Sequence, residues 1–268
     1  MGMFAAYFDE SGTTRESRVL VVAGYVSPVE QWKKFESEWW HTLANAGLDP
    51  NHIAFHLSEF ESRKLDHMKA KTPFAEWSDR KAEAVYETLL GIMRTRIRFG
   101  VAIGLIVDDY EQWASDGYTT LSRYAFCAIR CIHRVAASMD QLGLQDEIAY
   151  IFGDGAPGSE EVNRSVAGVL ANPEWRKEYR MASLGFGGTL KYLPLQAADI
   201  GVWETRRYCM TARNNPNEAG LRKSLEFLHK AIPHPSEYYD RAGLENYLKE
   251  FAERHAEEAR EVEVKKNL

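Results

Sequence analysis

The chain has 268 residues, of which 45% are hydrophobic and 27% charged, and its formal net charge is −6. This composition is that of a globular protein with a sizeable core, and the acidic balance argues against a protein that grips long duplexes by charge alone. Three cysteines, an odd number without a CxxC spacing, argue against a disulfide scaffold. No signal peptide and no apolar run of about 20 residues is visible, so a cytoplasmic location without membrane contact is predicted.

Hydrophobic patterning predicts a strand at the start of the chain and a hairpin after it. Residues 3–8 are apolar and stop at two adjacent carboxylates, Asp9 and Glu10. Residues 19–26 are rich in β-branched side chains and lie close enough in sequence to pair with the first strand across a short turn. A helix is predicted over residues 28–46, with proline in its first turn and glycine at its end.

The rest of the chain alternates strands with helices. Further strands are predicted over residues 98–107, 148–152 and 181–186, and helices over residues 79–94, 119–142, 159–170, 195–210, 217–231 and 238–264. This order predicts an α/β fold with an α+β mixed sheet. The predicted organisation is one domain over residues 1–212, with an irregular insertion at about residues 47–78, and a C-terminal helical extension over residues 213–268 packed on that domain.

Three acidic positions share a pattern, in which a carboxylate lies where an apolar segment ends or faces inward. Asp9 and Glu10 end the first strand, and Asp154 ends the strand in AYIFGDG. Asp199 lies on the apolar stripe of the helix in LPLQAADIGVW, where an ionised carboxylate needs a partner. Each position alone is better explained by a turn or a cap. Together they offer oxygen ligands to one point, which is what Mg²⁺ or Mn²⁺ requires.

These motifs resemble a family of uncharacterised bacterial and phage proteins, domain-of-unknown-function family 3800. The resemblance lies in YFDESG, in FHLSEF about fifty residues later, in the strand that ends in aspartate, and in LPLQAADIGVWETRRY. It implies a ribonuclease H-like core, in which acids on the first strand, at the end of a later strand and on a late helix hold two divalent metals. Carried over, the metal ligands are Asp9, Asp154 and Asp199. Glu10 matches the family's DESG motif, although strand alternation points its side chain away from Asp9.

Several further residues are candidates for supporting roles at this site. The glutamate that the superfamily usually carries on an intervening helix has no clear match, and Glu38 and Glu59 are the candidates. His56 could move a proton or contact a phosphate, or it is a structural histidine bonded to the backbone. Glu204 and Arg207 could be a supporting acid and a phosphate contact, but a plain surface ion pair is the simpler interpretation of both.

The predicted function is that of a divalent-metal-dependent phosphodiester hydrolase, a nuclease that uses Mg²⁺ or Mn²⁺. The catalytic candidates are Asp9, Glu10, His56, Asp154 and Asp199, and the partner is a nucleic acid or nucleotide substrate. The alternative, from another class, is a non-catalytic binding or assembly protein that keeps the ribonuclease H-like fold and the acidic pocket.

The last predicted helix carries an apolar stripe. Its members are Leu244, Tyr247, Leu248 and Phe251. Most stripes of this kind pack on their own domain, which is the expectation here, and a homodimer through this helix is the alternative.

Overall fold

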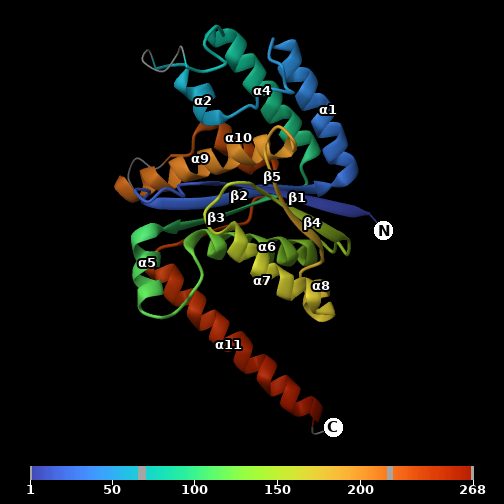
Figure 1. Ribbon diagram of the computed structural model, residues 1–268, viewed down its shortest axis with the longest axis vertical. Coiled ribbons are helices and arrows are strands. Elements are labelled where there is room, and N and C mark those ends of the chain that lie inside the picture. The colour runs from blue at the N-terminus through green and yellow to red at the C-terminus, as the bar shows by residue number, and fades with distance from the viewer. Residues whose placement is uncertain (1, 66–70, 216–219, 267–268) are drawn as a thin grey trace.

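A mixed six-stranded sheet forms the centre of the computed structural model, which describes residues 2–65, 71–215 and 220–266, with side chains as far as residue 253. The strands are β1 (Met3–Ser11), β2 (Val19–Pro28), β3 (Phe99–Ile106), β4 (Glu147–Gly153), β5 (Met181–Gly187) and β6 (Ser236–Tyr239). Their order across the sheet is β5-β4-β1-β2-β3-β6 (Figure 1). Strands β1, β2 and β3 form an antiparallel meander, whereas β4 and β5 run parallel to β1 and β6 runs parallel to β3.

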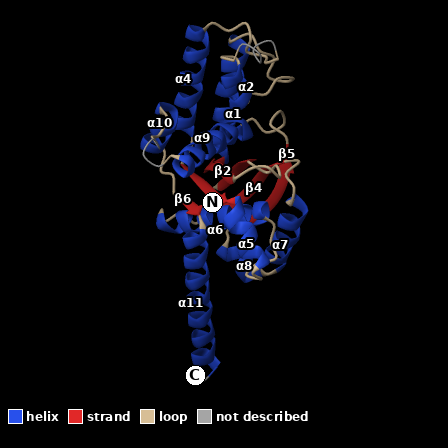
Figure 2. Ribbon diagram, turned by 90° about the vertical axis from the view of Figure 1, so that its left-hand side faces the viewer, coloured by secondary structure: helices blue, strands red, loops and turns tan. Residues whose placement is uncertain are grey.

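The sheet is covered by helices on both faces, which explains why β2 and β3 are almost continuously apolar. Above the sheet in Figure 1 lie α1 (Val29–Asn45), α2 (Leu57–Ser62), α4 (Asp79–Arg96), α9 (Pro194–Asn214) and α10 (Lys223–Ala231). Below it lie α5 (Val107–Ser115), α6 (Arg123–Gln141), α7 (Ser159–Ala171) and α8 (Pro173–Glu178). Helix α11 (Arg241–Lys266) leaves the lower layer and extends away from the sheet (Figures 1 and 2).

The alternation of β1 builds two cores at once. Phe4 and Phe8 join the core beneath the sheet, and Ala5 and Tyr7 join the core above it. Asp9 has the same parity as Ala5 and Tyr7, so its side chain starts on the face that α9 covers. The strand therefore delivers its terminal carboxylate to the helix that carries Asp199.

The segment predicted as an insertion is anchored by aromatic packing. Phe55, Phe60 and Phe74 are buried, and their ring centroids lie 5.2 to 5.6 Å apart. This cluster places α2 beside α9, and with it the residues of FHLSEF. Residues 66–70 of the predicted insertion lie outside the described residues.

The predicted α/β class with a mixed sheet is confirmed, and the order of the first five strands is compatible with the ribonuclease H-like core that the resemblance implies. The C-terminal part was predicted to be purely helical, and this is wrong, because it contains strand β6, which pairs with the edge of β3. With only four residues, β6 is too short to give a periodic signal. The helix predicted from residue 119 begins at Arg123, since the side chain of Ser122 caps it by accepting from the Ala125 N–H.

The C-terminal helices begin later than predicted. Helix α10 begins at Lys223, and residues 217–219 of the predicted helix lie outside the described residues. Helix α11 begins at Arg241, where β6 has just ended. Leu244 is fully buried and Tyr247 and Leu248 pack against the lower core, so this part of the stripe contacts its own domain. Phe251 is 43% exposed, and the homodimer stays a prediction.

A membrane-spanning segment is not found in the described chain, because no helix there combines the necessary length with the necessary hydropathy.

Candidate active site

The ends of β1 and β4 meet at one edge of the sheet. The two strands are parallel and Phe8 pairs with Phe152, so Asp9 lies beside Gly153 on the neighbouring strand. A Cβ atom on Gly153 would lie 2.7 Å from Asp9 Oδ1 and 3.4 Å from Glu10 Oε2. Both carboxylates therefore converge on the space that this glycine leaves open.

Glu10 does not behave as strand alternation predicts. Its side chain starts on the face opposite to that of Asp9, but its longer side chain brings the carboxylate back to Gly153, because β4 ends there. Removal from water and the charge of Asp9 raise the pKa of Glu10 to about 8. Removal from water and the charge of Asp199 likewise raise the pKa of Asp9 to about 7. The predicted separation of Asp9 and Glu10 is therefore wrong.

Asp199 approaches the same place from α9, and it also contacts the start of α2. Its Oδ2 accepts a 2.7 Å hydrogen bond from the backbone N–H of Leu57, and its Oδ1 lies 3.5 Å from His56 Nδ1. Interaction with Asp199 raises the pKa of His56 despite the ring's partial burial. His56 therefore pairs with the Asp199 carboxylate through Nδ1, so the structural alternative in which this nitrogen bonds to the backbone is wrong.

Asp154 lies at the exposed rim of the site. Its backbone N–H donates to the Gly187 carbonyl, which ties the end of β4 to the end of β5. Its carboxylate is close enough to Glu10 to contribute to the raised pKa of that residue. Asp9, Glu10, Asp154 and Asp199 thus come from three separate segments of the chain to one edge of the sheet, and we refer to these four as the carboxylate cluster.

The carboxylate cluster has one basic neighbour, His56, and no arginine or lysine partner among the described residues. In the part of the chain that the structure describes, no arginine or lysine lies within ion-pair distance of any of its four members, and the partner of Asp199 is His56. Glu10 Oε2 is buried and accepts no hydrogen bond there. Close carboxylates that lack a cation, with an unpartnered buried oxygen among them, are a donor set that suits a hard divalent ion.

The side chains of the carboxylate cluster do not form a metal coordination shell as they stand. Within the described ranges, no group of three or more His, Cys, Asp or Glu side chains is close enough to hold a metal ion. The binding of an ion by Asp9, Asp154 and Asp199 therefore stays a prediction, and it requires these side chains to draw together around the ion.

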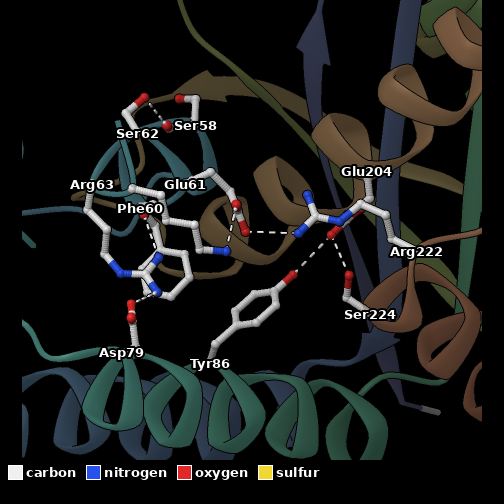
Figure 3. Close-up of polar contacts among 11 residues, drawn as sticks. Ser58, Phe60, Glu61, Ser62, Arg63, Asp79, Tyr86, Glu204, Arg222 and Ser224 are labelled. Atoms are coloured by element: carbon white, nitrogen blue, oxygen red, sulfur yellow. Dashed lines mark hydrogen bonds and ion pairs between the residues drawn. The ribbon is translucent and has the colours of Figure 1, made fainter. Parts of the chain in front are cut away.

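The remaining candidates divide between the site and the rest of the molecule. Glu59 is exposed in the first turn of α2 and acts electrostatically on His56, whereas Glu38 is on α1 and pairs with Arg96. Glu204 is only 1% exposed and forms a separate network with Tyr86 and Ser224 (Figure 3). The surface location predicted for an ion pair of Glu204 is therefore wrong, because the carboxylate is buried, although its Oε2 lies 3.6 Å from Arg222 Nε.

Arg207 is exposed on α9 and does not form the surface ion pair that was predicted for it. Its guanidinium lies over the Trp203 ring, 5.2 Å from the centroid, and no carboxylate of a described residue is within ion-pair distance. An aromatic partner four residues earlier on the same helix face explains this difference.

Two residues at the site have no role in the sequence-based interpretation. Burial raises the pKa of the Tyr124 phenol on α6, and the nearby carboxylate of Glu10 adds to this rise. Gly153 provides the opening into which Asp9 and Glu10 reach. Gly153 precedes Asp154 in AYIFGDG, and its position there is typical of an ordinary turn residue. The sequence pattern around Tyr124 does not distinguish this tyrosine from a core residue.

Comparisons with known proteins add little to this geometry. No protein-family model matches the chain, and no curated protein matches it either. Among solved structures, a chain from the complex of PCNA and RNase HII from Archaeoglobus fulgidus aligns with a TM-score of 0.38 and 15% sequence identity, over 94% of this chain and 89% of that one.

Proposed function

We propose that this chain is a divalent-metal-dependent phosphodiester hydrolase, a nuclease that acts at the carboxylate cluster, and that it belongs with the ribonuclease H-like proteins that its motifs resemble. One observation carries the proposal: acids from β1, the end of β4 and α9 converge, and among the described residues they have His56 beside them but no arginine or lysine within ion-pair distance. Such a cluster is costly to bury unless a cation shares it. A bound divalent cation would offset the unfavourable free energy of these adjacent carboxylates, which is why we infer a metal site here.

Asp9 is the central ligand in this proposal, because its carboxylate interacts with both Glu10 and Asp199. Asp199 and Asp154 would hold the ion or ions from either side, with Glu10 as a further oxygen donor. When bound, divalent cations lower the pKa of water and neutralise the charge that develops on the oxygens of a phosphodiester. The backbone N–H of Leu57 keeps Asp199 directed at the cluster.

His56 is the residue placed to handle a proton or a phosphate oxygen. Its Nδ1 faces Asp199, which leaves Nε2 for a substrate, and 35% of its side chain is exposed. An imidazole held in this way can donate a hydrogen bond to a phosphate or transfer a proton at Nε2. Exposure at the rim is what a large substrate such as a nucleic acid needs.

Cleavage of labelled oligonucleotides tests the proposal. Single-stranded RNA, single-stranded DNA and an RNA–DNA hybrid are incubated with the protein and Mn²⁺ or EDTA. We expect cleavage that requires Mn²⁺, that falls at least about a hundredfold in Asp9→Asn and Asp199→Asn, and that persists in Asp49→Asn, where the carboxylate is exposed and paired with His52. Equal cleavage by Asp9→Asn would contradict the proposal. Binding of Mn²⁺ with no cleavage of any substrate would favour the non-catalytic binding protein.

A further inference from the structure

A cavity of about 770 Å³ lies between α4 and α10, and none of its lining residues belongs to the carboxylate cluster. We propose that this cavity binds a nucleoside monophosphate. Its volume falls in the range of about 300 to 1,000 Å³ that is typical of small-molecule sites. The proposal is independent of the proposed nuclease function, because the cavity has its own charged, polar and apolar walls.

One wall of the cavity is cationic, and part of its charge has no partner. Arg94 and Lys223 line it, and neither lies within ion-pair distance of a carboxylate of a described residue. Arg222 lines it too, and its Nη1 is buried without a hydrogen-bond partner although Nη2 donates to Glu61 at 2.9 Å. Arginine and lysine in this state are the side chains that bind phosphate.

A buried acid holds this wall in place. Glu204 is 1% exposed, and its Oε1 accepts hydrogen bonds from Ser224 Oγ and, at 3.3 Å, from Tyr86 OH (Figure 3). Its Oε2 lies 3.6 Å from Arg222 Nε. Glu204 is thus a positioning residue that fixes three lining side chains from behind the cavity. A wall fixed in this way is pre-organised for a ligand, which lowers the entropic cost of binding.

The start of α10 adds to the positive character of the same wall. The helix begins at Lys223, and no side chain caps its first turn. The free N–H groups of a helix N-terminus favour an anion. They lie next to the lysine and arginine already described, so the phosphate is expected at this end.

Other lining residues of the cavity suit a base. Leu90 and the rings of Tyr86 and Phe227 provide apolar and aromatic surface beside the cationic groups, with the Arg94 guanidinium 5.6 Å from the Phe227 centroid, and such surfaces stack with the face of any nucleobase. The carboxylates of Glu83 and Glu87, one helical turn apart on α4, can accept hydrogen bonds from the amino or ring N–H groups of a base. An anion with a flat aromatic body therefore matches the cavity better than inorganic phosphate does.

Isothermal titration calorimetry with the full chain in EDTA tests this proposal. EDTA removes divalent ions, so binding at the carboxylate cluster does not contribute. The probes are AMP, GMP, CMP and UMP, with inorganic phosphate and adenosine for comparison. We expect one site per chain for at least one monophosphate, with inorganic phosphate and adenosine each bound at least about tenfold more weakly.

Variants on α10 provide matched controls. Lys223→Gln and Phe227→Leu are each expected to weaken the binding of the monophosphate by about tenfold or more. Lys230→Gln makes the same charge change on the same helix, at a side chain that is 75% exposed and outside the cavity, and should leave the affinity unchanged. Melting temperatures of all variants show that the fold is retained.

Three results would overturn the proposal. The first is no binding of any of the four monophosphates at millimolar concentration. The second is equal binding by Lys223→Gln and Lys230→Gln. The third is inorganic phosphate bound as tightly as the monophosphates, which would leave the aromatic lining residues of the cavity without a role. None of these results bears on the cleavage activity, and a failure of cleavage does not bear on this cavity.

Discussion

Gly153 determines whether the carboxylates of Asp9 and Glu10 can occupy the same corner of the sheet. The atoms that a Cβ would meet there are Asp9 Oδ1, at 2.7 Å, and Glu10 Oε2, at 3.4 Å. The first distance is too short for a real contact, so any larger side chain must push Asp9 away. The positions of the Asp9 and Glu10 carboxylates therefore depend on the absence of a side chain at residue 153.

We expect Mn²⁺ to raise the melting temperature of the wild type but not that of Gly153→Ala, although this variant keeps the fold. The added methyl group displaces the Asp9 carboxylate from the cluster, whereas the strand itself tolerates alanine. The measurement is the melting temperature with and without Mn²⁺. Gly185→Ala on β5 is the matched control, since a Cβ there meets no atom within 4 Å. An undiminished response to Mn²⁺ in Gly153→Ala would show that Asp9 does not bind the ion.

At the scale of elements, a single buried amide joins three segments around the site. Gln196 Oε1 accepts hydrogen bonds from Trp39 Nε1 at 2.9 Å and from the Phe55 N–H at 3.0 Å. Its Nε2 donates to the Thr189 carbonyl at 3.0 Å. The amide thereby connects α1, the segment before α2 and the loop before α9, and it keeps His56 near Asp199.

We expect Gln196→Leu to lower the free energy of unfolding by about 2–6 kcal/mol. The substitution leaves two buried N–H donors without an acceptor, and each such loss costs about 1–3 kcal/mol. Urea denaturation measures the change, and Gln112→Leu, at an exposed position of α5, serves as the control. A loss below about 1 kcal/mol in Gln196→Leu would mean that water or another group replaces the amide.

The junction between α10 and β6 makes stability depend on pH. His234 packs against Tyr25 and stacks on His229, with ring centroids 5.8 and 4.8 Å apart. Removal from water, assisted by the nearby His229, lowers the pKa of His234 to about 3. The unfolded chain therefore takes up a proton at this ring more readily than the folded chain does. Its contribution to stability is complete above the unfolded pKa of about 6.5 and is lost as the pH falls below that value.

We expect the wild type to lose more stability than His234→Asn between pH 7.5 and pH 5, by about 1–2 kcal/mol. Urea denaturation at the two pH values gives the difference. His52→Asn is the control, because that ring is exposed and paired with Asp49. Identical pH dependence in His234→Asn and the wild type would show that the ring is not shielded from water.

The sequence predicted what depends on local pattern and missed what depends on distant contacts. The first two strands and α9 follow from apolar runs and from helical spacing, and the motifs around Asp9, Asp154 and Asp199 marked the edge of the sheet at which they lie. Strand β6 was missed because it has only four residues and is a strand only through its pairing with the edge of β3. The position of the Glu10 carboxylate depends on where β4 ends, which the sequence around Glu10 does not contain.

At the scale of the whole molecule, the sheet order brings together acids that are remote in sequence. The parallel pairing of β1 with β4 places the ends of both strands at one edge, and α9 crosses β1 and β2 above it. The upper layer around α4 and α10 holds the cavity of about 770 Å³, apart from this edge. The two proposed sites therefore lie in different parts of the molecule and can be tested separately.

Thermal unfolding in rising concentrations of Mn²⁺ tests most directly whether the carboxylate cluster shares a cation. A site that is filled at a hundred times its dissociation constant adds about 2.7 kcal/mol, which raises the melting temperature of a chain of this size by about 5–10 °C. We predict this rise for the wild type and for Asp49→Asn, and no rise for Asp9→Asn. In EDTA, Asp9→Asn should melt no lower than the wild type does, because the substitution removes a poorly solvated charge. A wild-type melting temperature that does not respond to Mn²⁺, or an equal rise in Asp9→Asn, would contradict the account.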